Sequence, residues 1–143
     1  MKILIINGPN LNMLGRREPE IYGKETFEDI LSELSTRFQG IEILYFQSNH
    51  EGDIVSRIQE TLDENLAGLV LNMGAYTHYS YAIFDALNMV KALKVEVHLS
   101  HLYSREPFRH KSVISPACQG MISGLGKMGY RMAIEWIVEK NAL

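Results

Sequence analysis

The apolar residues fall into two kinds of segment that alternate along the chain. Short continuous runs rich in β-branched residues, such as Ile3-Leu4-Ile5-Ile6, are typical of strands that are buried on both faces. Longer segments repeat their apolar residues every three or four positions, as helices with one buried face do. We therefore predict strands over residues 2–7, 41–47, 68–72, 95–99 and 120–123, and helices over 27–39, 52–65, 80–93 and 127–141.

The alternation of strands and helices predicts the fold class. Helical connections between strands imply a parallel sheet that is covered on both faces. Five such strands in 143 residues indicate a small three-layer α/β sandwich. We expect the flavodoxin-like strand order 2-1-3-4-5 rather than a Rossmann order. Because we find no internal repeat, low-complexity tract or linker, residues 1–143 are interpreted as a single catalytic domain.

Composition narrows the class of protein. Hydrophobic residues make up 46% and charged residues 22%, which is ordinary for a globular protein. The net charge of −3 offers no basic excess for nucleic acid. Cys118 is the single cysteine, so neither an internal disulfide nor a multi-cysteine zinc site is expected. With no apolar run long enough for a membrane span or a signal peptide, we expect a cytoplasmic protein that does not bind membranes.

Polar residues follow three of the predicted strands. In parallel α/β sheets, ligands bind beyond the carboxyl ends of the strands. The first strand ends at Asn7-Gly8-Pro9-Asn10, the third at Asn72 with Thr77-His78 following, and the fourth at His98-Leu99-Ser100. An isolated asparagine in such a place often only caps a turn, but three ends with the same pattern favour a shared site.

Two loops at this edge are rich in arginine. Residues 8–25 form an unusually long connection that includes Arg16, Arg17 and Tyr22, and it is either a functional lid or a structural Ω-loop. The loop after the fourth strand holds Arg105 and Arg109. Because the planar guanidinium suits carboxylates, these arginines favour an anionic small molecule. A solvated surface loop with an Arg105–Glu106 ion pair is the alternative.

Several cofactor motifs are missing or misleading. The first strand is followed by neither a flavin phosphate loop nor acidic phosphoacceptor residues, and no Walker A motif occurs. The segment from Gly124 to Gly129 matches G-x-G-x-x-G, but it lacks the acidic residue and second strand of a dinucleotide site. We interpret it as a tight turn with close helix–strand packing, and we expect no cofactor.

Metal binding is weakly indicated. Glu96 and His98 share a strand face, and His101 follows the strand. This leaves metal-assisted hydrolysis through His98 and His101 as an alternative. Pairing of Glu96 with His98, which would orient the imidazole, is the preferred interpretation, and a purely structural histidine also remains open.

The remaining groups suit acid–base chemistry. Tyrosine has an ordinary pKa of about 10 and is a poor base at neutral pH. A guanidinium about 4 Å away contributes roughly 4 kcal/mol at an effective dielectric of 20, which lowers the pKa of a phenol by up to about 3 before desolvation opposes it. Arg17 and Tyr22 could thus supply a phenolate base, with a histidine on the opposite side as the acid. Such a pair suits proton abstraction beside a carbonyl with loss of a leaving group.

Several motifs together resemble a known family, the type II 3-dehydroquinate dehydratases. The resemblance covers essentially the whole chain. It is carried by Asn7-Gly8-Pro9-Asn10-Leu11, Leu14-Gly15-Arg16-Arg17-Glu18-Pro19, Tyr22-Gly23, Gln47-Ser48-Asn49, Leu71-Asn72, Thr77-His78-Tyr79-Ser80, Glu96-Val97-His98-Leu99-Ser100, Arg105-Glu106, Phe108-Arg109-His110, Gly124-Leu125-Gly126 and Gly129-Tyr130.

The resemblance implies a reaction and its chemistry. The family dehydrates 3-dehydroquinate to 3-dehydroshikimate in the shikimate pathway, by anti elimination through an enolate. By resemblance, Tyr22 removes the C2 proton, Arg17 lowers the pKa of Tyr22, and His98 protonates the departing hydroxyl. Glu96 orients His98, and Asn10 holds a water near the developing enolate.

The resemblance also implies binding residues and an assembly. Arg105 helps to close the lid, and Asp85 reaches the site of a neighbouring subunit. The family forms dodecamers of four trimers. Substrate hydroxyls and carboxylate are bound by Asn72, His78, Leu99, Ser100 and Arg109.

The chain departs from the family pattern at four positions. His101 stands where asparagine is usual, Ser104 where alanine is common, Pro107 where glutamate is common, and Met73 is atypical after Asn72. Because His101 directly follows the binding pair, substrate affinity is the property these changes touch first. A non-catalytic module that binds a small polyhydroxy acid is the second hypothesis, since the same arginines would serve it.

Overall fold

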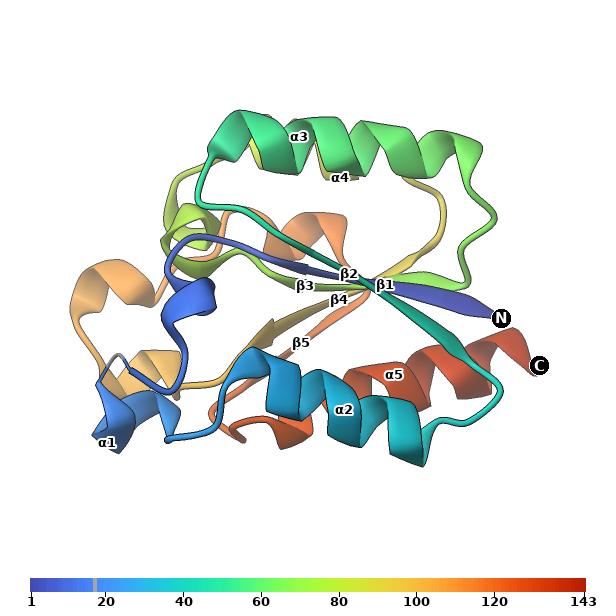
Figure 1. Ribbon diagram of the computed structural model, residues 1–143. Helices are drawn as coiled ribbons and strands as arrows, with labels where there is room; N and C mark the ends of the chain where they lie inside the picture. Colours follow the sequence, from blue (N-terminus) through green and yellow to red (C-terminus); the bar gives the residue numbers. More distant parts are fainter. Residues whose placement is uncertain (17) are drawn as a thin grey trace.

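Five parallel strands form the centre of the structure, a computed structural model that describes residues 1–16 and 18–143 (Figure 1). The strand order is β2-β1-β3-β4-β5, and every neighbouring pair is parallel. This confirms the predicted flavodoxin-like order. The strands are β1 (Lys2–Asn7), β2 (Glu42–Gln47), β3 (Gly68–Asn72), β4 (Leu93–His98) and β5 (Gly120–Ser123).

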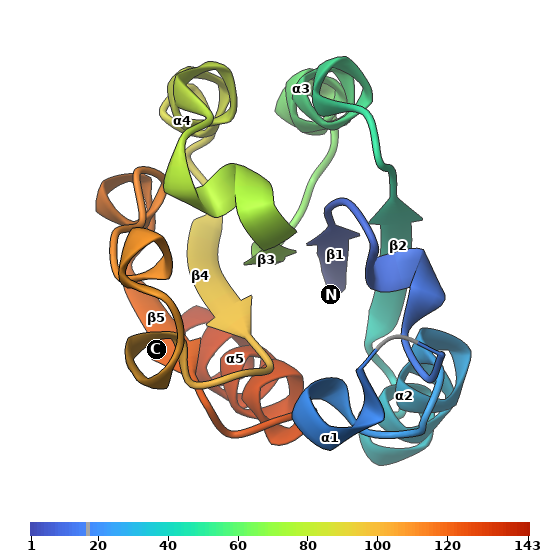
Figure 2. The same cartoon turned by 90° about the vertical axis from the view of Figure 1, so that its left-hand side faces the viewer.

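Helices cover both faces of the sheet and make the three layers seen in Figure 2. The helices α2 (Phe27–Arg37) and α5 (Met128–Asn141) lie on one face, and α3 (Glu51–Glu60) and α4 (Tyr81–Leu87) lie on the other. A short helix, α1 (Pro19–Tyr22), interrupts the connection between β1 and α2. Within residues 1–16 and 18–143, no helix combines the length and apolar character that a bilayer crossing requires.

Alternation along the strands produces two cores. On β1, Ile3 and Ile5 pack toward α2 and α5, whereas Leu4 and Ile6 pack toward α3 and α4. All four side chains are fully buried, and each such burial contributes about 1.5–3 kcal/mol. A continuous apolar run is therefore what a strand between two helical layers requires.

A capping box fixes the start of α2. The Thr26 hydroxyl accepts a hydrogen bond from the Asp29 N–H (3.3 Å), and the Asp29 carboxylate accepts one from the Thr26 N–H (3.0 Å). This reciprocal capping box satisfies two backbone donors at the helix N-terminus. The helix ends at Arg37, two residues before the predicted end.

The predicted helix over 80–93 is wrong in its second half. After Leu87 the chain forms turns closed by hydrogen bonds between residues three positions apart, and the Val90 N–H donates to the Leu87 carbonyl (3.1 Å). The backbone must leave the helix there because Leu93 pairs with Gly68 in the sheet. For the same reason β4 begins two residues before the predicted 95–99 strand. The predicted 52–65 helix likewise ends early, at Glu60, and a 3₁₀ turn over Thr61–Asp63 follows it.

The glycine motif near the C-terminal helix serves packing, as predicted. A Cβ atom on Gly129 would lie 3.0 Å from a methyl group of Val97 and 3.4 Å from one of Ile122. Helix α5 therefore approaches β4 and β5 more closely than a larger residue would allow. Gly124 has a φ of +94°, so the turn before the helix also needs glycine.

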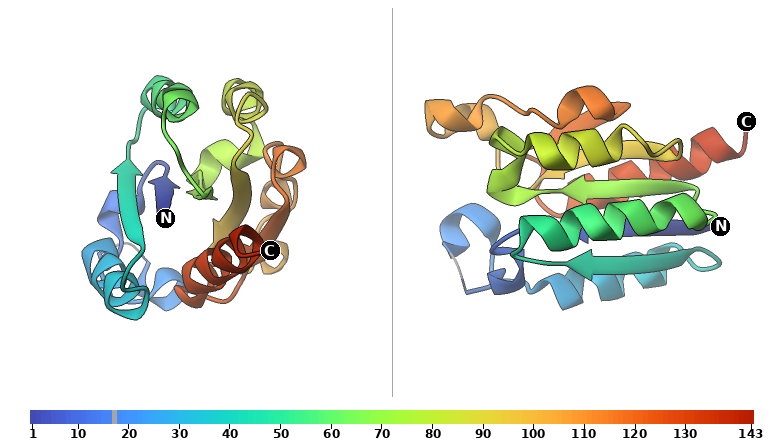
Figure 3. Two further views of the ribbon diagram at one scale, coloured as in Figure 1. Left: turned by 90° about the vertical axis from the view of Figure 1, so that its right-hand side faces the viewer. Right: turned by 90° about the horizontal axis from the view of Figure 1, so that it is seen from above.

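The carboxyl ends of the strands gather on one side of the molecule. Both chain termini lie at the opposite end of the sheet (Figures 1 and 3). At the carboxyl edge, Asn7 of β1 pairs in register with Asn72 of β3 on one side and Gln47 of β2 on the other. The loops that follow the strands surround this edge (Figure 2).

Candidate active site

A pocket of about 250 Å³ lies at the carboxyl ends of β1, β3 and β4. Eight of the twelve candidate residues line it, and they come from four separate stretches of sequence. These are Asn10, Asn72, His78, His98, Leu99, Ser100, Arg105 and Arg109, and the rest of the lining is Pro9, Leu11, Gly74, Ala75 and Leu102.

The other four candidates have different positions. Glu96 is fully buried beside His98 and does not line the pocket. Asp85 is exposed on α4 and is not part of the pocket wall. Arg17 and the side chain of Tyr22 lie outside the described residues, so the predicted phenolate base stays a prediction.

His98 and Glu96 form a buried hydrogen-bonded pair at the end of β4. The Nε2 atom of His98 contacts Oε2 of Glu96, as two residues on one strand face can. Because an ionised carboxylate only accepts hydrogen bonds, Nε2 carries a proton in this pair. Nδ1 is then the nitrogen through which His98 can exchange a proton with a ligand in the pocket.

The Glu96 carboxylate has further donors on its other sides. Thr77 donates its hydroxyl to Oε2 (2.7 Å), and Ser112 lies 2.9 Å from both carboxylate oxygens. Burial alone would raise the pKa of Glu96, but the hydrogen bonds and the charge of His98 outweigh it and hold the pKa below its ordinary value. Glu96 is therefore an anion that these hydrogen bonds hold in place beside the imidazole of His98.

The loop after β1 enters the pocket through Asn10. Its backbone is left-handed (φ 70°), a conformation that asparagine tolerates better than most residues, and its N–H donates to the Asn49 side chain (3.0 Å). One step earlier, a Cβ atom on Gly8 would lie 2.3 Å from the Met73 carbonyl oxygen. Only glycine lets the loops after β1 and β3 approach this closely.

Leu11 and Leu14 are buried against the core, which anchors the first half of the long connection. By contrast, Ile21 in α1 is 41% exposed. The segment thus has a packed beginning and an exposed middle, and whether it acts as a lid stays a prediction.

Asn72 is hydrogen-bonded to Tyr130 of α5. Its Nδ2 group donates to the Tyr130 hydroxyl (2.9 Å), and its Oδ1 atom accepts from the Gly74 N–H (3.2 Å). The Tyr130 hydroxyl donates in turn to Oδ1 of Asn7 (2.8 Å). Burial raises the pKa of Tyr130 far above its ordinary value, so the hydroxyl keeps its proton.

Two arginines, Arg105 and Arg109, also line the pocket. Arg105 donates to the Ser100 hydroxyl (3.1 Å), and Arg109 forms an ion pair with Glu106 (3.0 Å). Glu106 also lies 3.9 Å from Arg105, so the ion pair of the alternative interpretation is present, with Arg109 as a further partner of Glu106. Both arginines line the pocket, and their positive charge suits a carboxylate ligand.

His78 lines the same pocket. Its Nδ1 atom lies 2.8 Å from the Lys111 carbonyl oxygen. Burial lowers the pKa of His78, and the nearby His98 and Arg109 charges act in the same direction. A neutral His78 donates Nδ1–H to Lys111 and presents Nε2 as an acceptor for a ligand hydroxyl.

Reasoning from sequence missed the supporting partners of these residues. Thr77 and Ser112 hold Glu96, and Tyr130 holds Asn72. Thr77 was named among the polar residues after the third strand and in a motif of the resemblance, and Tyr130 only in such a motif, but neither was assigned a partner. Ser112 had none, because its contact with Glu96 depends on how the loop after β4 folds back.

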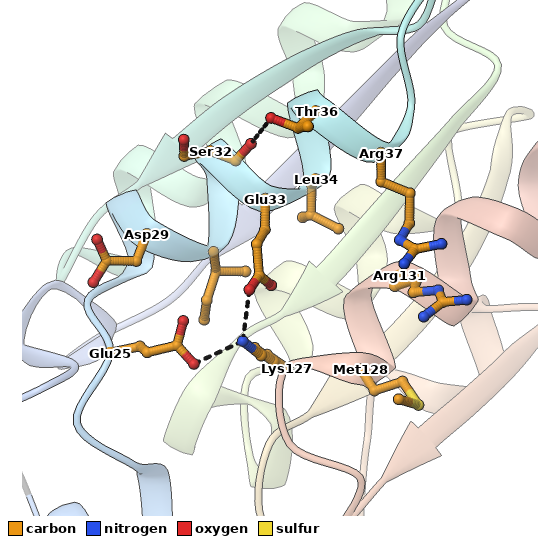
Figure 4. A pocket seen from close by; sticks show the side chains of 11 residues that line it. Glu25, Asp29, Ser32, Glu33, Leu34, Thr36, Arg37, Lys127, Met128 and Arg131 are labelled. Carbon is orange, nitrogen blue, oxygen red and sulfur yellow. Dashed lines mark hydrogen bonds and ion pairs between the residues drawn. The ribbon is translucent and has the colours of Figure 1, made fainter.

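A larger hollow, of about 820 Å³, lies between α2 and α5 (Figure 4). Its wall includes Lys127, whose ammonium group lies 2.8 Å from both Glu25 and Glu33. These contacts raise the pKa of Lys127. No histidine is among the described residues that line the hollow, so it lacks the imidazoles found in the pocket at the strand ends.

His98 and His101, the two histidines of the metal alternative, do not share the pocket. His101 is exposed, packs near Tyr103 with ring centroids 6.5 Å apart, and does not line the pocket with His98. In the part of the chain that the structure describes, no group of three histidine, cysteine, aspartate or glutamate side chains is arranged to hold a metal ion.

Comparison with known proteins gives a consistent result. A family model described as Dehydroquinase class II matches residues 1–138. A 3-dehydroquinate dehydratase of Lachnoclostridium phytofermentans is 53% identical over 143 residues, which is 99% of each chain. One from Thermotoga maritima is 51% identical over 142 residues, covering 98% of this chain and 96% of its own.

Solved structures agree. A type II dehydroquinase from Butyrivibrio crossotus superposes with a TM-score of 0.93 at 51% identity, covering 96% of this chain and 97% of the other. One from Propionibacterium acnes superposes with a TM-score of 0.90 at 41% identity, covering 95% and 94%.

Proposed function

The chain belongs to the class II dehydroquinase family, and on this premise we propose that it dehydrates 3-dehydroquinate to 3-dehydroshikimate. It would act as a hydro-lyase of the shikimate pathway, with residues 1–143 as one catalytic domain. The observation that carries the proposal is the pocket at the strand ends. It combines an imidazole backed by a buried carboxylate with two arginines that suit a substrate carboxylate.

The proposed reaction is an anti elimination through an enolate. Tyr22 takes the proton from C2, and the positive charge of Arg17 favours the phenolate that this step needs. Both residues belong to the connection after β1, whose earlier residues Asn10 and Leu11 line the pocket. Asn10 holds a water close to the oxygen on which the enolate charge develops.

His98 supplies the proton for the leaving hydroxyl. Glu96 engages Nε2, so the transferred proton leaves from the other ring nitrogen, Nδ1. The nearby anion stabilises the imidazolium before transfer and fixes the plane of the ring. No metal or cofactor is needed, because one base, one acid and a stabilised enolate complete the elimination.

The remaining pocket residues bind the substrate. Arg109 is proposed to hold the carboxylate, and Arg105 to help close the connection after β1 over the ring. The ring hydroxyls are proposed to contact Asn72, His78, Leu99 and Ser100.

The proposal includes an assembly, a dodecamer of four trimers in which Asp85 reaches a neighbouring subunit's pocket. Its support is the exposed face of α4, where Tyr81 (64% exposed) lies one turn before Asp85. An aromatic side chain beside a carboxylate on an open helix face suits a subunit contact. We also propose that the enzyme is cytoplasmic, in keeping with a biosynthetic step.

The test is a direct assay with 3-dehydroquinate. The product is a conjugated enone, so its ultraviolet absorbance should rise with time. His98→Gln should lower kcat about 10²–10⁴-fold, the usual contribution of a positioned acid. The control His50→Gln changes an exposed histidine that does not line the pocket and should keep the wild-type rate.

Each outcome separates the proposal from its rivals. Binding of quinate in calorimetry with no enone from the wild-type protein would favour a non-catalytic binding module. Loss of activity after chelation would favour the metal-assisted alternative. A wild-type rate in His98→Gln would contradict the assigned acid.

A further inference from the structure

A buried chain of hydrogen bonds connects α5 to the pocket. Tyr130 is fully buried, and its ring meets Phe27 edge-on with centroids 5.0 Å apart. Phe27 stacks on Tyr45 at 4.8 Å, and the Tyr45 hydroxyl accepts from Nδ2 of Asn7 (3.3 Å). The Tyr130 hydroxyl bridges Asn7 and Asn72, the last residues of the adjacent strands β1 and β3.

The directions of these hydrogen bonds fix the amide of Asn72. Since the Gly74 N–H donates to Oδ1 of Asn72, the atom facing Tyr130 is Nδ2. The single hydroxyl proton of Tyr130 goes to Oδ1 of Asn7, so its oxygen is available as an acceptor. Only one of the two Nδ2 protons of Asn72 is used there, and the other remains for the pocket.

We propose that Tyr130 is a positioning residue, which holds the Asn72 amide with an N–H directed to a substrate oxygen. The inference rests on the proposed function, in which Asn72 binds substrate. Without the hydroxyl, Oδ1 of Asn7 and one N–H of Asn72 lose their shared partner in a buried place, which is costly for both groups. Of the two hydrogen bonds that fix the Asn72 amide, the one from the Gly74 N–H (3.2 Å) then remains without the one to Tyr130, so the N–H that faces the substrate is directed less tightly.

The matched variants are Tyr130→Phe and Tyr45→Phe. Each removes one hydroxyl from the same aromatic cluster, but only Tyr130 contacts Asn72. Loss of a binding contact shared by ground state and transition state raises KM and leaves kcat nearly unchanged. We expect Tyr130→Phe to raise KM about 5- to 20-fold with kcat within about threefold, and Tyr45→Phe to leave both within about twofold.

A double-mutant cycle separates positioning from general destabilisation. In an Asn72→Ala background, the change Tyr130→Phe should add less than about twofold to KM, because its target is gone. A KM of Tyr130→Phe within twofold of wild type would overturn the proposal. So would a full additional increase in the Asn72→Ala background.

Two further measurements keep the proposal testable. The affinity for quinate, measured by calorimetry, should fall in Tyr130→Phe and stay near the wild-type value in Tyr45→Phe, as KM predicts. If the wild-type protein forms no enone, the proposed reaction is refuted, and these quinate affinities still test the role of Tyr130. If Tyr130→Phe does not fold, a structure of the wild-type protein with quinate decides. Contact of Nδ2 of Asn72 with a quinate oxygen supports the proposal, and its absence overturns it.

Discussion

Replacing Glu96 by glutamine should damage catalysis far more than folding. A carboxylate and an imidazolium about 4 Å apart attract by roughly 4 kcal/mol at an effective dielectric of 20. Glutamine keeps the shape and one acceptor oxygen but loses the charge, and it turns an NH₂ group toward donors that previously met oxygen. If Oε2 is replaced, Thr77 and His98 lose the oxygen that accepts their hydrogen bonds; if Oε1 is replaced, Ser112 keeps Oε2 as an acceptor and faces the new NH₂ group.

The amide dipole retains part of the attraction, so most but not all of the 4 kcal/mol is lost. At 1.36 kcal/mol per tenfold, kcat should fall roughly 100- to 1,000-fold. The enone assay measures kcat, while thermal unfolding and quinate affinity verify that the pocket persists. The control Glu135→Gln removes an exposed carboxylate that pairs with Arg131 on α5, and it should keep the wild-type kcat. A folded Glu96→Gln variant with kcat within threefold of wild type would refute the assigned role.

Three other predictions concern Ser112, the titration of Glu96 and the close approach of Gly8 to Met73. Ser112→Ala keeps the Glu96 charge and loses one donor, so kcat should fall only about 3- to 10-fold in the enone assay, and a larger loss than in Glu96→Gln would contradict the order of effects. The pKa of Glu96 in the folded protein lies below its ordinary value near 4.5. The ionised carboxylate therefore stabilises the fold above pH 4.5, and this stabilisation is lost as the pH falls through the folded-state pKa. The free energies of unfolding of wild type and Glu96→Gln, measured in urea, should therefore converge only in acid. Gly8→Ala forces a Cβ atom against the Met73 carbonyl and should lower the Tm by several degrees. In the control Gly52→Ala, on an exposed turn of α3, the new Cβ atom meets nothing within 4 Å, so this variant should be more stable by about 0.5–1 kcal/mol. Equal Tm values for the two variants would contradict the close approach at Gly8.

Local pattern was sufficient for most of the fold. The run Ile3-Leu4-Ile5-Ile6 places alternate residues in two cores, and this follows from strand geometry alone. Pairing of Glu96 with His98 follows from the same period of two. The end of the helix before β4 was predicted wrongly because the pairing of Leu93 with Gly68, a tertiary contact, decides where the backbone becomes extended.

The site was predictable as a set of strand ends but not as a hydrogen-bond network. Residues at the ends of β1, β3 and β4 converge because parallel strands end on the same side of the sheet. By contrast, the Tyr130 hydroxyl meets Asn72 across 58 positions of sequence, and Ser112 meets Glu96 across 16. No local periodicity encodes such contacts, because they depend on how α5 and the loop after β4 pack.

The central claim is that a phenolate from the connection after β1 removes a proton across the pocket from His98. Tyr22→Phe deletes the base and little else, so it tests the claim most directly. We expect kcat for enone formation to fall at least about 1,000-fold while quinate affinity stays within about threefold of wild type. A Tyr22→Phe variant that forms the enone at the wild-type rate would contradict the account.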